Sequence, residues 1–402
     1  MSLSPPTRDI LNLAIRSFTA DSEMQMLQQQ QSSGRAVRDW GGWMDALPSL
    51  SSGIDNDSLS PAIMALTAAI TTHKADLRPT KLSYLTTYAT ALRKLRISLK
   101  NIHQGNRFMV LATIICLYTA ALMLPIEENT QTRQTHHKGL QDLFLAIGPE
   151  GFISVATHKL FAGFRGSIIF EAIYMRRSSF TSHVDWKTKP FKLQGQNIIQ
   201  RSLTIAADIP PLLEKFDALD KMDAFNQELS AIALTTGFRK IIRGIYESFV
   251  LEATAPSYWQ VFPDDPDSPY RFTNLSTANI WLNYWLFRAI CFIHLHLLQT
   301  RYGVSDSADV NQESTLDQAV EHATSIYRSM DFVLQDDMKI QGPASRIFTA
   351  RVAYDILKFD GARSAEKLAA IQRIIGRFEL LGFKIPSLPD DRPFWTLNTG
   401  RV

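Results

Sequence analysis

The chain is poor in the residue types and motifs that mark several large protein classes. It holds only two cysteines, Cys116 and Cys291, among 402 residues, and both lie inside apolar runs. Two cysteines exclude a disulfide framework and a cysteine-based zinc cluster, and they are typical of a reducing compartment. We interpret both as core residues and not as nucleophiles. No nucleophile-elbow pattern and no glycine-rich phosphate loop after a strand is present.

An excess of charge of one sign is also missing. The 42 Lys and Arg residues nearly balance the 39 Asp and Glu residues, which gives a net charge of +3. No arm or face gathers this surplus, so we expect no direct nucleic-acid partner and no membrane-surface partner. The N-terminus, MSLSPPTRDI, lacks the basic and apolar regions of a signal peptide. We therefore expect a nuclear or cytoplasmic protein that is not secreted.

Strand signals are almost absent, and an apolar period of 3.6 residues recurs instead. We therefore predict an all-α fold, a single large multi-helix array. The uncharged run Phe108–Leu124 is at the short limit for a membrane span, and we predict that it is a core helix. Helices are predicted at about 7–19, 58–72, 80–100, 106–124, 136–147, 152–177, 197–215, 219–250, 274–300, 312–335, 343–358 and 362–381.

The predicted organisation has three parts. Residues 1–50 hold an N-terminal helix and a Gln-rich connection around Met24–Gly34, which is low in complexity. Residues 51–385 form the helical domain, and residues 386–402 form an irregular tail. Pro386, Pro389 and Pro393 exclude a regular helix in the residues that follow Gly382.

The most informative segment is Ser276–Thr300, which has no Gly or Pro and carries apolar side chains nearly all round. Such a helix is central and buried. Asn279, Asn283 and His294 lie on it as well, and buried polar groups need partners. The helix must therefore contact several neighbours or line a polar pocket.

Arg288 lies one turn after Tyr284 and one turn before Phe292 in this helix. A guanidinium at this position can hold a carboxylate or diphosphate through two hydrogen bonds. Alternatively, it is a structural arginine that stacks on a Trp ring or pairs with an acidic side chain. Trp281, Tyr284 and Trp285 are candidate ligand-binding residues beside it, and their ring faces would also stabilise a cation. Arg288 is thus the candidate catalytic residue if the chain is an enzyme.

Arg165 and Glu171 lie among apolar positions of the predicted helix 152–177. A buried arginine needs a carboxylate or several carbonyl groups. The two residues are therefore either members of a structural ion pair inside the bundle or candidate ligand-binding residues.

Acidic residues and histidines offer weaker candidates, and we predict no metal site. Asp264-Asp265-Pro266-Asp267 superficially resembles an aspartate-rich magnesium motif, but its prolines predict a loop, and we interpret it as a solvated acidic turn. Asp336-Asp337 follows a predicted helix end, where we expect a partner such as Lys339.

His294 and His296 are two residues apart on a helix, so they point to opposite sides and do not share a metal. We interpret one of them as a core histidine. His136-His137 is expected to open a helix, where capping or solvent contact is favoured.

The order of several features along residues 5–385 resembles the all-helical regulatory domain that follows the zinc-cluster DNA-binding module in fungal transcription factors. The features are Trp43, Leu47-Pro48, the apolar helix 108–124, His137, Gly139-Leu140, Gly148-Pro149, Phe161, Arg165, Arg176-Arg177, Trp186, Tyr258, Phe262-Pro263, Asp264, Tyr270, Phe272, Tyr284-Trp285, Ile326, Ser329, Gly342-Pro343 and Leu381-Gly382-Phe383. The six metal-binding cysteines of that module have no counterpart here, and Thr119 stands where the family often has an acidic residue.

The resemblance implies a regulator without its own DNA-binding module, in a secondary-metabolite pathway. It would act through a small hydrophobic ligand or a protein partner, could form a homodimer, and would need no cofactor. The alternative is an unconventional helical biosynthetic enzyme on the same scaffold. A terpene-type cyclase would use magnesium and a diphosphate substrate, whereas a cofactor-free pericyclase would need only a shaped apolar pocket with placed donors.

Overall fold

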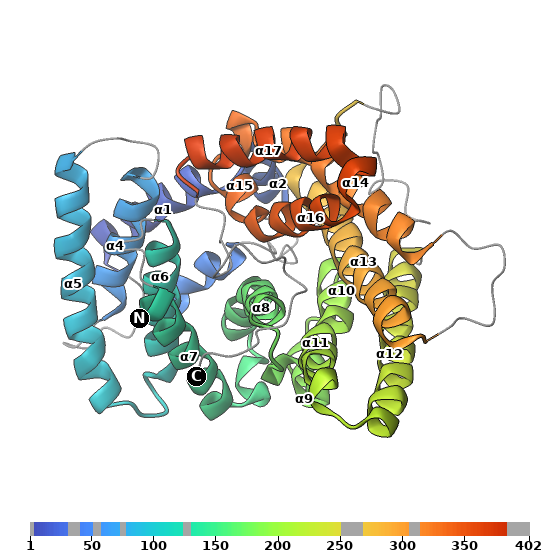
Figure 1. Cartoon of the computed structure of the whole chain (residues 1–402). Helices are drawn as coiled ribbons and strands as arrows, with labels where there is room; N and C mark the ends of the chain where they lie inside the picture. The colour runs from blue at the N-terminus through green and yellow to red at the C-terminus, as the bar shows by residue number, and fades with distance from the viewer. Residues whose placement is uncertain are drawn as a thin grey trace. The chain divides into compact units, whose positions relative to one another are not determined.

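The computed structural model describes residues 4–30, 41–50, 58–72, 78–123, 130–250, 268–304 and 314–383. In these ranges every regular element is a helix, so the prediction of an all-α fold is confirmed (Figure 1). None of the described helices is long and apolar enough to cross a membrane. The predicted 386–402 tail lies outside the described residues, and the predicted boundaries at residues 50 and 385 stay a prediction.

The chain divides into two compact units. Unit 1 comprises Met1–Phe164, His183–Gly195 and Lys339–Gln341, and unit 2 comprises Arg165–Ser182, Gln196–Met338 and Gly342–Val402. The helix α8 (Val155–Met175) begins in unit 1 and ends in unit 2.

Unit 1 is organised around α6, the predicted core helix. Its helices are α1 (Pro5–Phe18), α2 (Asp21–Gln30), α3 (Leu47–Leu50), α4 (Leu59–Thr72), α5 (Arg78–Lys100), α6 (Arg107–Met123), α7 (Thr130–Ile147) and α9 (Val184–Thr188), with 3₁₀ turns at Gly42–Ala46, Pro149–Phe152 and Lys189–Phe191. The helix α6 is buried on nearly every face and packs against α4, α5 and α7. This packing explains its apolar sequence and confirms that it is a core helix.

Aromatic rings fill the interior of unit 1 beside α7. Phe152 is fully buried, with ring centroids 5.2 Å from Phe144, 5.4 Å from Phe161 and 5.8 Å from Trp186. Phe161 lies 6.0 Å from Phe191. These separations are typical of favourable ring pairs in tilted or edge arrangements. The cluster holds the end of α7, the start of α8 and the segment around α9 in one core.

Two glycines permit close backbone approaches. A Cβ at Gly163 of α8 would lie 2.4 Å from the backbone nitrogen of Trp43 in unit 1. A Cβ at Gly342 would lie 2.3 Å from the carbonyl oxygen of Val333 in unit 2. Real Cβ atoms do not approach backbone so closely, so any larger residue at either position would require the backbone to move.

Unit 2 is organised around α13 (Leu275–Tyr302), the helix that we predicted to be central and buried. It packs against α10, α12, α14 and α16, and it is buried on nearly every face (Figure 1). The other helices are α10 (Ile198–Ala206), α11 (Ile209–Ala218), α12 (Ala224–Val250), α14 (Thr315–Val333), α16 (Ile347–Asp360) and α17 (Ala365–Leu380), with 3₁₀ turns at Phe180–Ser182, Leu219–Lys221, Asp336–Met338 and Gly361–Ser364. The short α15 (Gln341–Ala344) joins residues of both units.

Both ends of α13 carry local stop signals. The side chain of Asn274 caps the helix by accepting a hydrogen bond of 2.8 Å from the backbone N–H of Thr277. Gly303 ends the helix in the left-handed conformation, with φ 64°. These signals fix the register that places the side chains of α13.

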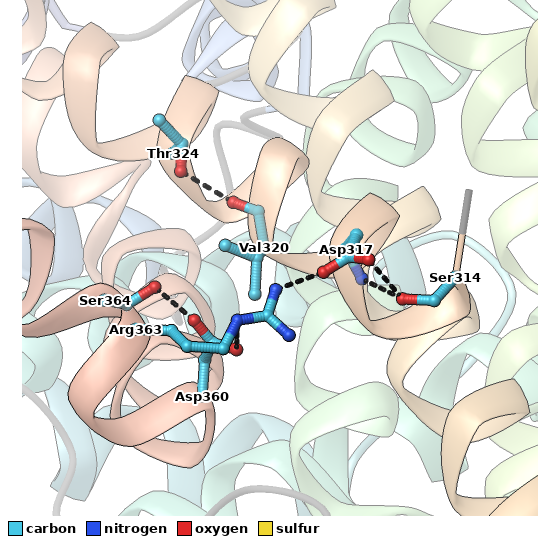
Figure 2. Close-up of polar contacts among 7 residues, drawn as sticks. All are labelled: Ser314, Asp317, Val320, Thr324, Asp360, Arg363 and Ser364. Carbon is cyan, nitrogen blue, oxygen red and sulfur yellow. Dashed lines mark hydrogen bonds and ion pairs between the residues drawn. The ribbon is translucent and has the colours of Figure 1, made fainter.

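Polar contacts tie the start of α14 to the turn between α16 and α17. Arg363 bonds Asp317 and lies 3.4 Å from Asp360, whose carboxylate accepts a 2.6 Å hydrogen bond from Ser364 (Figure 2). Ser314 caps α14 and bonds Asp317 at 2.6 Å. The pair of Arg363 with Asp317 is exposed and contributes little to the free energy of unfolding, whereas the Asp360 side chain is buried.

Several sequence predictions of helix boundaries are wrong. The connection predicted at Met24–Gly34 is helical as far as Gln30 in α2. The predicted helix 197–215 is two helices, α10 and α11, divided at Asp208 before Pro210 and Pro211. The helix α7 begins at Thr130, so His136 and His137 lie inside it and do not open it. Lys339 pairs at 2.7 Å with Asp21, whereas we expected Asp336 or Asp337 as its partner.

Candidate functional site

The candidate site lies on one face of α13. Trp281, Tyr284, Trp285 and Arg288 follow one another at helical spacing, so the register of α13 directs them to the same side of the helix. The structure thus places four of the six candidate ligand-binding residues on one face of α13. Trp285 is buried, and the other three are half-buried.

Rings from two other segments complete an aromatic face, which we define as Tyr246, Phe249, Tyr270, Trp281, Tyr284 and Trp285. Phe249, near the end of α12, lies 4.4 Å from both Trp281 and Tyr284 between ring centroids. Trp281 lies 5.3 Å from Trp285, which lies 5.5 Å from Tyr270. These contacts join rings from the three segments into one aromatic cluster.

Arg288 is fixed beside the aromatic face. Its guanidinium carbon lies 5.0 Å from the ring centroid of Tyr284, 5.3 Å from that of Phe292 and 5.9 Å from that of Tyr246. Its Nε donates a hydrogen bond of 3.0 Å to Nε2 of His322 in α14. The two Nη groups have no hydrogen-bond or ion-pair partner among the described residues.

His322 accepts this bond as a neutral imidazole. Burial first, and the charge of Arg288 second, lower the pKa of His322 to about 3. Its ring also lies 5.6 Å from Phe292 and 6.1 Å from Tyr284. An uncharged acceptor orients the guanidinium without neutralising it.

The remaining two nominated residues, Arg165 and Glu171, lie on α8. Arg165 is fully buried, and its Nη1 donates to the backbone oxygen of Gln200 at 3.2 Å and to the side-chain oxygen of Gln200 at 3.4 Å. Burial lowers the pKa of Arg165 to about 9. Glu171 is half-buried. The contacts of Arg165 with Gln200 are those of a core residue, and its proposed role in ligand binding stays a prediction.

The buried asparagines of α13 bind an arginine that the sequence did not nominate. Arg346, only 1% exposed, donates hydrogen bonds of 2.6 and 3.0 Å to the side-chain oxygen of Asn279 and one of 2.8 Å to that of Asn283. This cluster satisfies the expectation that both asparagines need partners. It ties α13 to the start of α16.

A second buried polar cluster joins Arg176, Asp217 and His294. Arg176 makes paired hydrogen bonds to Asp217, the shorter at 2.6 Å, and its Nη1 lies 3.1 Å from Nε2 of His294. Nδ1 of His294 lies 2.7 Å from the carbonyl oxygen of Ile290. Burial first, and then the charge of Arg176, lower the pKa of His294 far below its ordinary value. His294 is therefore a neutral core histidine, as predicted for one of the pair.

The remaining candidates are the two cysteines, the acidic motif and possible metal ligands. Cys116 and Cys291 are fully buried, and burial raises the pKa of both thiols, which is unfavourable for nucleophilic attack. Asp264-Asp265-Pro266-Asp267 and Tyr258 lie outside the described residues. Within the described ranges, no three His, Cys, Asp or Glu side chains lie together in a way that could hold a metal ion.

Sequence reasoning missed the residues that complete the site from other helices. Tyr246 and Phe249 lie at helical spacing near the end of α12, and His322 lies on the buried face of α14. The apolar period of each helix could be recognised in the sequence, but the sequence did not indicate which helices pack against each other.

Comparisons of the chain with protein-family models, with curated proteins and with solved structures gave no match.

Proposed function

We propose that the chain is a regulatory domain, similar to that of fungal transcription regulators, that responds to a small, largely apolar organic anion bound at the aromatic face. It would act in the nucleus through a protein partner and serve a secondary-metabolite pathway. Arg288 supports the ligand-binding part of this proposal. Three rings and a neutral histidine hold its guanidinium, while both Nη groups have no partner among the described residues.

The same geometry favours one class of ligand. A guanidinium with two available Nη donors binds a carboxylate, sulfonate or phosphate through parallel hydrogen bonds. The rings of Phe249 and Trp281 contact the ring of Tyr284, which lies 5.0 Å from the guanidinium carbon of Arg288. These rings offer apolar contact to the body of a ligand whose anionic group binds Arg288. A compound that combines a flat apolar body with one anionic group fits both parts.

Binding can be tested with anilinonaphthalene sulfonate, which has aromatic rings and one sulfonate. Fluorescence titration of the full chain should show saturable binding, and Arg288→Ala should weaken it by about 10- to 100-fold, the value of one charge-assisted contact. Arg243→Ala removes an exposed arginine of α12 and serves as the charge-matched control. Equal affinity in Arg288→Ala and wild type, with unchanged circular dichroism, would refute the site.

The regulatory role needs a separate measurement. Deleting the gene in its source organism should lower transcripts of a metabolite pathway, and wild type but not Arg288→Ala should restore them. Chromatin precipitation should recover the protein at those promoters through its partner. Unchanged transcripts together with an accumulated pathway intermediate would instead favour the enzyme.

The enzymatic alternative rests on the same residues. The Nη donors of Arg288 beside the rings of Trp281 and Tyr284 could polarise a carbonyl group in a cofactor-free pericyclic reaction. A magnesium-dependent cyclase would additionally need converging carboxylates. Turnover by purified protein, with and without magnesium, distinguishes these two forms.

A further inference from the structure

A second concave surface in unit 2 lies between α14 and α17. It is an open hollow of about 280 Å³. The helix α14 contributes Tyr327, Arg328 and Asp331, and α17 contributes Arg373, Ile374 and Arg377. This volume lies just below the range of roughly 300–1,000 Å³ that is typical of small-molecule sites. The hollow therefore suits a compact molecule and not a long chain.

The charge of the hollow is unbalanced. Among the described residues, three arginines and one carboxylate line it, so the formal charge of this part of the lining is +2. Asp331 pairs with Arg377. Arg373 is exposed and has no hydrogen-bond or ion-pair partner among the described residues. Like charges gathered in one concave surface repel each other, and a bound anion would remove that repulsion.

Arg328 gives the hollow one rigid wall. Its guanidinium carbon lies 4.1 Å from the ring centroid of Tyr270. Its Nε donates to the carbonyl oxygen of Ser268 at 2.9 Å, and its Nη1 lies 3.1 Å from the hydroxyl of Tyr270. A guanidinium that is already ordered loses little further conformational freedom when a ligand binds.

Asp331 indicates which group the hollow accepts. Its carboxylate already pairs with Arg377 in the lining of the hollow, so an oxyanion can bind an arginine at this position. We propose that the hollow binds a small organic molecule that bears a carboxylate or phosphate, with Arg373 as its main contact and Asp331 as an internal competitor. Tyr270 contacts both Trp285 of the aromatic face and Arg328 of the hollow, but this proposal does not depend on the function proposed above.

Isothermal titration of the full chain with citrate and with inorganic phosphate, at constant ionic strength, tests the site. Arg373→Ala should weaken binding by about tenfold, because it removes one charge-assisted contact. Asp331→Asn should strengthen binding by about five- to tenfold, because it removes the competing carboxylate and frees Arg377. Citrate and phosphate in parallel show which of the two oxyanions the hollow prefers.

Controls make these outcomes decisive. Arg243→Ala should bind citrate and phosphate as wild type does, and Arg373→Ala should still bind anilinonaphthalene sulfonate at the other site. Opposite shifts in Arg373→Ala and Asp331→Asn would support the proposal. It would be overturned if Asp331→Asn failed to strengthen binding, if Arg243→Ala matched Arg373→Ala, or if neither citrate nor phosphate bound.

Discussion

The interiors of the two units are built from different side chains. In unit 1, rings of Phe144, Phe152, Phe161 and Trp186 contact each other in tilted and edge arrangements. Unit 2 also has an apolar core, but it buries the guanidinium groups of Arg165, Arg176 and Arg346 against oxygen and nitrogen acceptors. An apolar core accepts most side chains of suitable volume, whereas a buried guanidinium requires acceptors at fixed positions. The two interiors should therefore respond differently to conservative substitution.

The largest expected effect is in unit 1. Phe152→Ala should lower the free energy of unfolding by about 3–5 kcal/mol, because it removes a fully buried ring and leaves a cavity. Phe152→Leu should cost roughly 1–2 kcal/mol, because neighbouring rings can move into the smaller space. Urea denaturation followed by circular dichroism measures both. Equal losses for the two variants would mean that this core does not tolerate a smaller apolar side chain. They would contradict the expected difference between the two interiors.

In unit 2, Arg346→Met should lower the free energy of unfolding by about 2–4 kcal/mol although methionine is similar in length. The loss arises because Asn279 and Asn283 would lose hydrogen bonds inside the core. Arg243→Met is the control, since Arg243 is exposed on α12, where a substitution changes the free energy of unfolding little. A small effect of Arg346→Met, similar to that of the control, would show that Asn279 and Asn283 find other hydrogen-bond partners when Arg346 is removed.

The smallest expected effect, within about one pH unit below 6.5, is a pH dependence of unit 2. The pKa of His322 is about 3 in the folded chain and about 6.5 when unfolded, so only the unfolded chain binds a proton between these values. The free energy of unfolding should therefore fall as pH decreases from 6.5 towards 3, by at most about 1.4 kcal/mol per pH unit for each such histidine. The lowered pKa of His294 acts in the same direction.

His322→Gln should reduce this slope, and substitution of the exposed His103 by Gln should leave it unchanged. Denaturation midpoints at a series of pH values provide the measurement. An identical slope in all three proteins would assign the acid sensitivity to other groups and would remove His322 from the comparison.

The sequence was sufficient for the fold class and for features within single helices. The period of 3.6 residues predicted the helices, and the all-round apolar pattern identified α6 and α13 as buried. Tyr284 and Phe292 were recognisable as neighbours of Arg288 because they lie one turn away on the same helix. The need of Asn279 and Asn283 for partners followed from burial alone.

Features that depend on two helices could not be predicted from the period of either. The sequence around His322 on α14 and Tyr246 on α12 does not indicate that these residues contact Arg288. Likewise, the sequence around Arg346 does not indicate that it binds Asn279 and Asn283. The helical state of Met24–Gln30 was missed because we interpreted low complexity as a connection, although glutamine forms helices well. The break at Asp208 was missed although Pro210 and Pro211 mark it.

The two crowded glycines have a use in comparative work. Because Gly163 and Gly342 face backbone atoms closer than any Cβ can approach, every chain with this same packing should keep glycine at both places. One such position lies in each unit, so together they provide fixed points for aligning distant relatives whose overall similarity is too low to detect. A homologue with a larger residue at either place would have to space its helices differently there.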